Sequence, residues 1–507
     1  MSKKIKNLEE IQIISADLKT KGKKIVLCHG VFDLLHLGHI KHFQEAKSLG
    51  DVLIVTITPD HFVNKGPNRP AFTTELRLDA IAALESVDFV AANKWPTSVE
   101  TLSMLKPDIY CKGPDYKDHN DDTTGKITDE AEAVEAIGGK VIYSKDITFS
   151  SSSLLNQYGS IFNKMQKVFI EKILKGKHIN QIKEVLDNLQ DLKVLVIGET
   201  IIDQYVFCEA LGKSGKEPVL VLRDLEMQQY VGGAAAIAKH LSDFCQNISL
   251  LSMLGEHKEH ENFIINGLPK NIKPLFIYKK NSPTITKKRY VDHVSNSKTL
   301  GVYSINDEKM DKSDEAQLLA YFQDLIPKHD LVIVSDYGHG FISQNLAKKL
   351  STFSVFKSLN AQINAANIGY HTMNNYSDID CAIINETELR HELRDRDGAL
   401  DKLMEKLAKN LQTRYLVVTQ GSAGATLYDK KKKKFHHCPA FANKVVDKIG
   451  SGDAMLALLS CSLRNGLDID LSLFLGSLAA AQSVESMGNS VPVNKIQLLK
   501  TVEHITK

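Results

Sequence analysis

With 507 residues, the chain is too long for one hydrophobic core, and its length predicts about two to four domains of roughly 100–200 residues each. Apolar residues make up 43% of the chain and charged residues 24%, which is ordinary for a soluble globular protein. A formal net charge of +2 gives no reason to expect a nucleic-acid surface, and no window approaches the roughly 18–20 apolar residues of a membrane span. We therefore expect neither nucleic acid nor membrane among its partners.

The cysteine pattern indicates a reducing compartment. Seven cysteines are scattered without Cys-x-x-Cys spacing, which argues against a disulfide framework and against a zinc site. The basic start at 1–6 is followed by Asn7-Leu8-Glu9-Glu10 rather than by the apolar core of a signal peptide. The expected localisation is cytoplasmic.

The first part of the chain alternates short apolar runs with helical patterns. Strands are predicted at 24–28, 52–57, 87–90, 109–111 and 141–143, with a helix from about 38 to 49. Strands separated by helices imply a parallel sheet covered on both faces, so we expect a Rossmann-like α/β domain over 1–157. After the serines at 150–153 the spacing becomes helical, and 158–190 is predicted to be a helical connector.

A second strand and helix series runs from the connector to the C-terminus. Buried strands are predicted at 194–197, 248–251, 331–334, 381–384 and 415–418. The run at 218–222 lies before a glycine pair and suits a small β lid outside the main sheet. The second domain is therefore predicted to be another parallel-sheet α/β unit over 191–507. The two halves share no motif, which indicates a fusion rather than a duplication.

Two histidines near the N-terminus lie where a strand gives way to a helix. His36 and His39 are three residues apart with Gly38 between them, so both imidazoles can face one anion above the helix N-terminus. Such a pair suits stabilisation of a triphosphate that is attacked at its α-phosphorus, because groups that tighten onto the transition state carry most of that catalysis. A capping or core role is the alternative for an isolated His-x-x-His pair.

The string Gly30-x-Phe32-Asp33-x-x-His36-x-Gly38-His39 resembles the signature of the cytidylyltransferase-like nucleotidyltransferases. Three further stretches agree with that family in order: 65–70 with Arg77 after it, 112–116, and 150–153. The resemblance implies that His36 and His39 hold the nucleotide phosphates. It also implies roles for Lys65 and Arg77 in neutralising phosphate charge, for Ser151 and Ser152 in contacting the nucleotide, and for Gly30, Phe32, Asp33, Gly38 and Lys112 in phosphate binding. The alternative for Lys65 is a solvated loop lysine, and the alternative for the serines at 150–153 is a flexible linker.

A second phosphate-handling pattern lies near the C-terminus, at Gly450-Ser451-Gly452-Asp453. The glycines allow the backbone to approach a phosphoryl group, and consecutive N–H groups at a helix start can form an anion hole. Asp453 is placed to accept the proton of an acceptor hydroxyl as the phosphoryl group is transferred. An ordinary turn is the alternative for this short pattern in isolation.

The run Asp447-x-x-Gly450-Ser451-Gly452-Asp453 resembles the signature of the ribokinase family of carbohydrate kinases, with further elements in order across 191–507. The resemblance implies a ribokinase-like fold in which Asp203, Gly232 and Gly233 bind the sugar. It further implies nucleotide binding by Thr419, Gly421, Gly424, Gly450, Ser451 and Gly452, catalysis by Asp453, and indirect contact of Asn385 and Glu388 with Mg²⁺. Residues 335–340 resemble a segment of the heptose kinase members.

Two positions depart from that family's pattern. Ala236 stands where the family often has Asn after its Gly-Gly-Ala-Ala motif, and 358–364 replaces the Asp-Pro-Lys segment of heptose kinases. Both changes affect which sugar would be bound more than they affect phosphoryl transfer, since Asp453 and the anion hole are intact.

Together the halves resemble the bifunctional heptose-phosphate kinases and heptose-1-phosphate adenylyltransferases of bacterial lipopolysaccharide or capsule synthesis, joined in the opposite order. The resemblance implies a kinase that uses ATP and Mg²⁺ on a sugar phosphate such as heptose 7-phosphate, and a transferase that uses ATP or CTP to make a nucleotide-activated sugar. It also implies a homodimer formed through the kinase lid.

Two alternative interpretations remain. In the first, the nucleotidyltransferase is active and the kinase-like half serves only as a sugar-binding or dimerisation module, as Ala236 and the altered segment near 360 would allow. In the second, the protein is a non-catalytic sensor or scaffold. That requires both signatures to be vestigial, and the intact His36, His39 and Asp453 argue against it.

Overall fold

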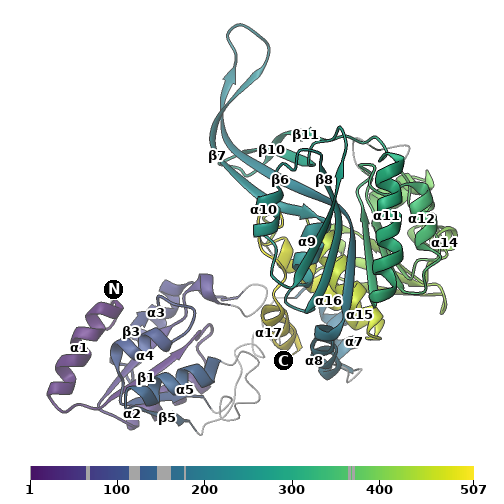
Figure 1. Cartoon of the computed structure of the whole chain (residues 1–507). Coiled ribbons are helices and arrows are strands. Elements are labelled where there is room, and N and C mark those ends of the chain that lie inside the picture. The colour runs from purple at the N-terminus through teal and green to yellow at the C-terminus, as the bar shows by residue number, and fades with distance from the viewer. Residues whose placement is uncertain are drawn as a thin grey trace. The chain divides into compact units, whose positions relative to one another are not determined.

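The chain divides into two compact units in a computed structural model, which describes residues 2–63, 69–113, 126–144, 162–175, 179–363, 367, 371–442 and 444–506 (Figure 1). The first unit comprises 1–164 and 496–507, which includes nearly all of helix α17 (Lys495–Thr506), and the second comprises 165–495. Both units are α/β, as the sequence predicted.

A five-stranded parallel sheet forms the centre of the first unit, in the order β3-β2-β1-β4-β5. Its strands are β1 (Ile25–Gly30), β2 (Val52–Ile57), β3 (Phe89–Ala92), β4 (Ile109–Lys112) and β5 (Lys140–Tyr143). From β1 the chain adds strands first on one side and then on the other. Strands β1 and β4 therefore flank the point where ligands bind in open α/β sheets, outside the carboxyl ends of the strands.

Helices cover both faces of this sheet. They are α1 (Leu8–Thr20), α2 (Leu37–Ser48), α3 (Thr74–Ala82), α4 (Val99–Leu105) and α5 (Lys126–Ala136), with a short 3₁₀ turn at Asp60–Phe62. Phe43 of α2 and Ile81 of α3 pack on one face, whereas α1, α4 and α5 pack on the other. Every residue of β2 is buried, because a parallel strand between two helical layers meets apolar side chains on both sides.

The second unit is built on a larger sheet whose main path runs β11-β10-β6-β12-β13-β14-β15-β16-β17, with β7, β8 and β9 attached at β6 and β8. The strands of its central part are β6 (Lys193–Lys213), β8 (Asn247–Gly255), β9 (Ile272–Lys279), β12 (Leu331–Asp336), β13 (Phe356–Ala361), β14 (Cys381–Asn385), β15 (Tyr415–Thr419), β16 (Ala425–Asp429) and β17 (Lys434–Cys438). The strands from β9 to β15 are parallel, and β16 and β17 close the edge as antiparallel strands.

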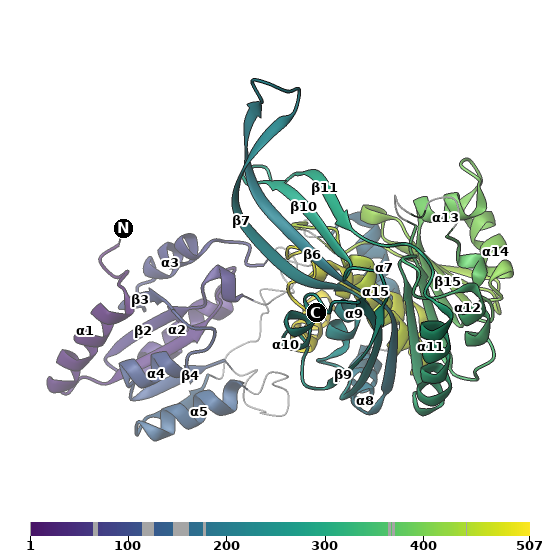
Figure 2. The ribbon, with the colours of Figure 1, turned by 45° about the horizontal axis from the view of Figure 1, so that its top comes forward.

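A lid rises from the central sheet through the second half of β6 (Figures 1 and 2). There β6 pairs with β7 (Leu220–Gly233) and β10 (Thr286–Asp292), and β11 (Lys298–Ser304) completes the lid. The predicted lid strand at 218–222 lies at the start of β7. One long strand therefore belongs both to the core and to the lid, which ties the lid to the carboxyl edge of the parallel strands.

Two helical layers enclose the central sheet. The helices are α7 (Lys164–Lys175), α8 (Ile179–Asn188), α9 (Ala234–Leu241), α10 (Glu261–Asn266), α11 (Lys312–Leu325), α12 (Gln344–Leu350), α13 (Glu386–Leu393), α14 (Leu400–Asn410), α15 (Ser451–Arg464) and α16 (Ile469–Ser483). Helices α11 to α14 share one core with the sheet, and α15 packs against both α9 and α16 on the opposite side. None of the described helices has the length and apolar run that a bilayer crossing needs.

Helices α7 and α8 fall within the predicted connector, and α7 packs as part of the second unit. The Phe169 ring lies 6.2 Å from that of Phe441 and 5.9 Å from that of Phe474, and the Lys172 ammonium pairs with Asp470 at 2.6 Å. A prediction from apolar spacing alone could not find this, because the partners lie about 270 to 300 positions further along the chain.

Candidate active sites

The two predicted histidines meet at the N-terminus of α2, directly after β1. His36 precedes the first residue of the helix and His39 lies in its first turn, and their rings stack with centroids 3.9 Å apart. The Phe32 ring lies edge-on against His39 at 5.3 Å and against Phe43 at 4.9 Å. The aromatic contacts hold the pair at the positive end of the helix dipole, where a phosphate would be bound.

Asp33 anchors a neighbouring loop. Its buried carboxylate accepts hydrogen bonds from the backbone N–H groups of Ala71 (2.6 Å) and Phe72 (3.2 Å), and it pairs with the Arg69 guanidinium at 3.2 Å. The 69–72 segment is thereby fixed beside the loop that leads from β1 to α2. Within the described residues, Asp33 thus positions backbone.

Arg77 is saturated by protein acceptors. Its guanidinium has five N–H donors. These groups donate hydrogen bonds to five oxygens, namely the carbonyl oxygens of Phe72, Val31 and Thr58, Asp60 Oδ1 at 2.6 Å and Thr74 Oγ1. The side chain is 1% exposed. Direct contact with a phosphate would require several of these bonds to break, so the described contacts give Arg77 a positioning role, and its neutralisation of phosphate charge stays a prediction.

Replacing Arg77 by Met is expected to destabilise the first unit by about 2–4 kcal/mol, because buried carbonyl acceptors lose their donor. Pulse proteolysis of the full chain in urea, read from fragments of the first unit, measures the shift in unfolding midpoint. Glu75→Ala on the exposed side of α3 is the control. An Arg77→Met chain that unfolds with the control would contradict this role.

Lys112 ends β4 on the other side of the same crevice. Its ammonium pairs with Glu130 of α5 at 2.8 Å and lies 5.1 Å from the ring centroid of Tyr110. Burial would raise the pKa of the Glu130 carboxyl, but Lys112 outweighs it and holds that pKa below the usual value. The pair is therefore ionised, and Lys112 contributes a fixed cation at the carboxyl edge of the sheet.

The structure describes only some of the other residues that were predicted for the N-terminal site. Gly30 ends β1 and Gly38 lies in the first turn of α2, where both were expected. Lys65, Ser151 and Ser152 lie outside the described residues, and their contacts stay predictions. His29 of β1, which sequence reasoning did not single out, is hydrogen-bonded through Nδ1 to Thr56 Oγ1 at 2.9 Å.

In the second unit, Asp453 lies in the first turn of α15. Gly450 precedes this helix with a φ of +88°, and a Cβ there would lie 1.8 Å from Asn489 Oδ1, so only glycine fits. Nothing lies within 4 Å of a Cβ built on Gly452, so the first turn faces open space. The predicted anion hole and the carboxylate therefore share one helix start.

Desolvation raises the pKa of Asp453 to about 7, and the neighbouring Asp203 carboxylate adds to the rise. The Tyr337 hydroxyl donates to Asp453 Oδ1 at 2.9 Å and fixes its orientation. A carboxylate with a pKa near 7 is suited to accept a proton from a hydroxyl, because it is still ionised in part while being a stronger base than an exposed aspartate.

The predicted sugar-binding residues are brought together beneath the lid. A Cβ on Gly232 would lie 2.2 Å from Asp203 Oδ2, and one on Gly233, whose φ is +64°, would lie 2.3 Å from the Glu199 carbonyl oxygen. The glycine pair therefore lets β7 approach the buried Asp203 carboxylate. Asp203 also pairs with Arg289 at 2.5 Å, so its position is set from the lid strand β10.

Sequence reasoning missed three cations at this site. Lys287 and Arg289 alternate along β10 and so point to the same face, and the Lys287 ammonium lies 5.7 Å from the ring centroid of Tyr337. Lys298 of β11 pairs with the buried Asp447 at 2.6 Å. The available signal was the run of three consecutive cations, Lys287-Lys288-Arg289. Such a run usually indicates a solvated face, so it does not by itself predict a site.

The predicted magnesium residues form a helix cap. The Glu388 backbone N–H donates to Asn385 Oδ1 at 2.8 Å, and the Asn385 N–H donates to Glu388 Oε2 at 3.1 Å. This capping box begins α13. Burial raises the pKa of Glu388 to about 7. Direct ligation of a metal would open the cap, so the geometry fits the predicted indirect contact better.

The predicted nucleotide turn follows β15. Thr419 ends the strand, and Gly421 and Gly424 take positive φ values of 58° and 100°. A Cβ on Gly424 would lie 2.1 Å from the Cys438 carbonyl oxygen, which explains the glycine. The turn meets the start of α13, where the Gln420 amide donates to Glu386 at 3.0 Å.

The two departures from the family pattern fit the fold without strain. Ala236 is fully buried in α9, and 358–361 continue β13 as an ordinary strand. The Asn360 amide donates to the Ile383 carbonyl oxygen at 2.9 Å, and Asn364 lies outside the described residues.

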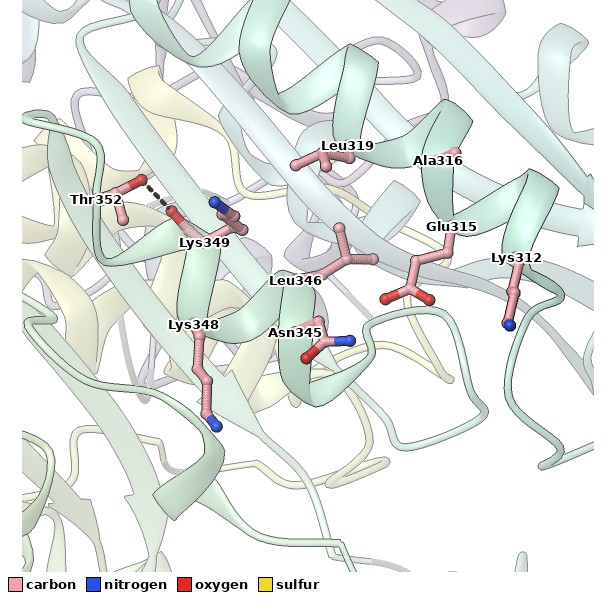
Figure 3. Close-up of a pocket in the computed structure, with 9 residues that line it drawn as sticks. All are labelled: Lys312, Glu315, Ala316, Leu319, Asn345, Leu346, Lys348, Lys349 and Thr352. Atoms are coloured by element: carbon pink, nitrogen blue, oxygen red, sulfur yellow. Dashed lines mark hydrogen bonds between the residues drawn. The ribbon is translucent and has the colours of Figure 1, made fainter.

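A surface hollow of about 620 Å³ lies between α11 and α12 (Figure 3). It is lined by Lys312, Glu315, Ala316, Leu319, Asn345, Leu346, Lys348, Lys349 and Thr352. None of the residues predicted for either site lines it, so the candidate sites are those at the carboxyl edges of the two sheets.

Comparison with known families assigns both halves. Residues 191–496 match the family model of the pfkB family carbohydrate kinases, and 27–157 match the cytidylyltransferase-like model. The first match covers more than half of the chain. The chain therefore belongs to the pfkB family of carbohydrate kinases, and it carries a cytidylyltransferase-like domain before the kinase domain.

Each of two curated relatives matches only part of the chain. A protein named bifunctional protein HldE from Nitratiruptor sp. is 44% identical over 139 residues, which are 27% of this chain and 30% of the relative. One of the same name from Campylobacter jejuni subsp. doylei is 30% identical over 321 residues, which are 62% of this chain and 66% of the relative. Each match thus spans less than two thirds of the relative's length. The domain order is reversed relative to these proteins.

Solved structures support the fold of the kinase unit. Phosphofructokinase-2 from Escherichia coli, in complex with potassium, matches with a TM-score of 0.51 at 12% identity, over 63% of this chain and all of that one. Its complex with fructose-6-phosphate matches with a TM-score of 0.50. At such low identity the likeness concerns the fold alone.

Proposed function

We propose that this chain catalyses two steps of nucleotide-sugar synthesis, with a sugar-phosphate kinase in the second unit and a nucleotidyltransferase in the first. The observation that carries the proposal is that each unit sets its catalytic side chains at a helix N-terminus at the carboxyl edge of its sheet. These are Asp453 on α15 and the His36–His39 pair on α2. A kinase-like half that served only as a binding module would not need Asp453 in an environment that raises its pKa to about 7.

In the kinase step, Asp453 accepts the proton of the acceptor hydroxyl while the N–H groups at the start of α15 stabilise the transferred phosphoryl group. Asp203 orients the sugar, and Tyr337 keeps the Asp453 carboxylate aimed. ATP donates the phosphoryl group, and Mg²⁺ neutralises charge on its phosphates. Asn385 and Glu388 would hold Mg²⁺ indirectly, since their own oxygens accept hydrogen bonds in the cap of α13.

In the transferase step, His36 and His39 bind the triphosphate as the sugar 1-phosphate oxygen attacks the α-phosphorus and pyrophosphate leaves. Lys112 adds a fixed positive charge at the edge of the same sheet. The helix dipole and the two imidazoles stabilise the charge that develops on the phosphate oxygens. Lys65, Ser151 and Ser152 are proposed to complete this site.

The proposed acceptor is heptose 7-phosphate, and the proposed product is a nucleotide-activated heptose with AMP or CMP as the nucleotidyl group. The resemblance of 335–340 to heptose kinases supports this choice, as does the match of each half to bifunctional relatives. The cations Lys287 and Arg289 near Asp203 support an acceptor that carries negative charge.

A pyrophosphate-release assay tests the proposal. The full chain with Mg²⁺ is given each of ATP, CTP, GTP and UTP with a panel of sugar 1-phosphates, and ADP release is measured with heptose 7-phosphate. Turnover of heptose 1-phosphate with ATP or CTP, together with ADP release, is the expected result. Turnover with another sugar alone would show that the product is a different activated sugar. No ADP release with any sugar phosphate would contradict the proposed kinase activity of the second unit.

We further propose a homodimer through the lid, supported by its exposed apolar residues. These are Leu211, Val219, Leu220, Val221, Leu225, Met227, Leu300, Val302 and Tyr303. A double change, Leu225→Asp with Met227→Asp, is expected to weaken the dimer about 100-fold, because charges would be buried at the interface. Analytical ultracentrifugation at micromolar concentration measures this, with Ile265→Asp on α10 as the exposed apolar control. A wild-type chain that sediments only as a monomer would contradict the dimer.

A further inference from the structure

Three potential metal ligands converge in the core of the first unit. Cys28 of β1, Cys111 of β4 and His42 of α2 bring one ligand atom each to within 4.8 Å of one another. Cys28 and Cys111 are register partners in neighbouring parallel strands, so their side chains point to the same face of the sheet, and α2 packs on that face. Among the described residues, no other group of three His, Cys, Asp or Glu side chains meets at this range.

We propose that Cys28, Cys111 and His42 bind a Zn²⁺ ion or a cation of similar softness between β1, β4 and α2. Two thiolates and one imidazole are the donor types that zinc prefers, and a three-ligand site keeps a fourth position for water. Tetrahedral bonds of about 2.3 Å to sulfur and about 2.0 Å to nitrogen place ligand atoms about 3.5–3.8 Å apart, so each side chain moves by about 1 Å or less.

A polar contact orients the His42 ring as a ligand. Nδ1 of the ring lies 3.0 Å from Ser144 Oγ, which fixes its orientation, as outer-shell partners of ligating histidines do. His42 is only partly buried.

The thiols must lose two protons when the ion binds. Burial and the adjoining Cys111 raise the pKa of the Cys28 thiol, whereas Lys112 lowers it. The ion replaces both protons, and two thiolates with Zn²⁺ and a neutral imidazole form a centre without net charge. Such a centre costs less to bury than a bare dication.

The position of the cluster gives it a structural consequence for the active site. Cys28 directly precedes His29 and Gly30 at the end of β1, and Cys111 directly precedes Lys112 at the end of β4. An ion bound here would clamp the two strands whose carboxyl ends form the proposed nucleotide crevice. Loss of the ion should then impair nucleotidyl transfer while leaving the kinase unit unaffected.

The experiment measures metal in the full chain, expressed without an affinity tag and purified without chelator. Elemental analysis is expected to find about one zinc ion per chain, and replacement by Co²⁺ is expected to give a thiolate-to-cobalt charge-transfer band with tetrahedral d–d absorption. The Cys28→Ser, Cys111→Ser double variant should lose that band, and His42→Gln should bind Co²⁺ about 100-fold more weakly.

Cys245 and Cys461 supply the matched control. Their thiols also contact each other in a buried position, but they lie in the second unit and belong to no group of three ligands among the described residues. Cys245→Ser should keep the metal and the cobalt spectrum. Wild-type protein that takes up less than about 0.1 ion per chain after equilibration with Zn²⁺ or Co²⁺ would overturn the proposal, as would a double variant with an unchanged spectrum. The wild-type titration needs no variant, so it decides the question even where a variant fails to fold.

Discussion

Replacing Asp453 by Asn is expected to slow phosphorylation of the sugar phosphate by about 10²–10⁴-fold and to leave nucleotidyl transfer unchanged. The amide keeps the shape of the side chain and can still contact Tyr337, whose hydroxyl lies 2.9 Å from Asp453 Oδ1. It cannot accept the proton of the acceptor hydroxyl. ADP release and pyrophosphate release from the same preparation measure the two activities.

The pH profile tests the same role independently. Desolvation raises the pKa of Asp453 to about 7, and the base acts only when it is ionised. The kcat/KM of the kinase should therefore rise with pH through about 7 and level off above it, and Asp453→Asn should lose this limb. Asp401→Asn, on the exposed surface of α14, is the matched control. An Asp453→Asn variant that kept more than a tenth of the kinase activity would contradict the role of Asp453 as the base.

Replacing His39 by Ala is expected to lower nucleotidyl transfer by about 10²–10³-fold without changing the kinase activity. The change removes one of two imidazoles that stack at 3.9 Å above the start of α2, so the triphosphate loses a group that stabilises its developing charge. Steady-state pyrophosphate release should show the loss mainly in kcat. The ring also packs against Phe32, so circular dichroism must accompany the kinetics.

Gln44→Ala, at an exposed position further along α2, is the control for any disturbance of that helix. It should retain full activity in both assays. A His39→Ala chain that lost kinase activity together with nucleotidyl transfer would show that the two sites are not independent.

Local sequence was sufficient to predict the helix start in each unit and the positions of most strands. Val52–Ile57 was predicted as a strand and is β2, because a short, mostly apolar run rich in β-branched residues suits a strand that is covered on both faces. The His36–His39 spacing was likewise sufficient, since the positions lie one turn apart on a helix whose start is marked by Gly38. Both inferences depend on interactions between residues that are close in the sequence.

Roles that depend on distant partners could not be read in this way. Arg77 was predicted to neutralise phosphate charge, but the sequence did not show that its N–H groups are donated to protein acceptors, which include Val31 and Thr58 from two other loops. Asn385 and Glu388 were predicted to contact magnesium indirectly, and only the structure shows that each side chain accepts a hydrogen bond from the other residue's backbone N–H in a helix cap. A residue type tells which bonds a side chain can make, but burial and neighbours decide which bonds it does make.

The sequence by itself determined that this protein has two α/β units, with a candidate phosphate-binding helix start in each, because periodicity and glycine placement are local properties. Only the tertiary structure decided which charges meet. Lys298 neutralises Asp447 from 149 positions away, and Tyr205 donates to the same carboxylate from 242 positions away. The absence of Cys-x-x-Cys spacing argued against zinc, yet β1, α2 and β4 bring Cys28, His42 and Cys111 together. Parallel strands that are adjacent in space are distant along the chain, so spacing in the sequence carries no record of such a cluster.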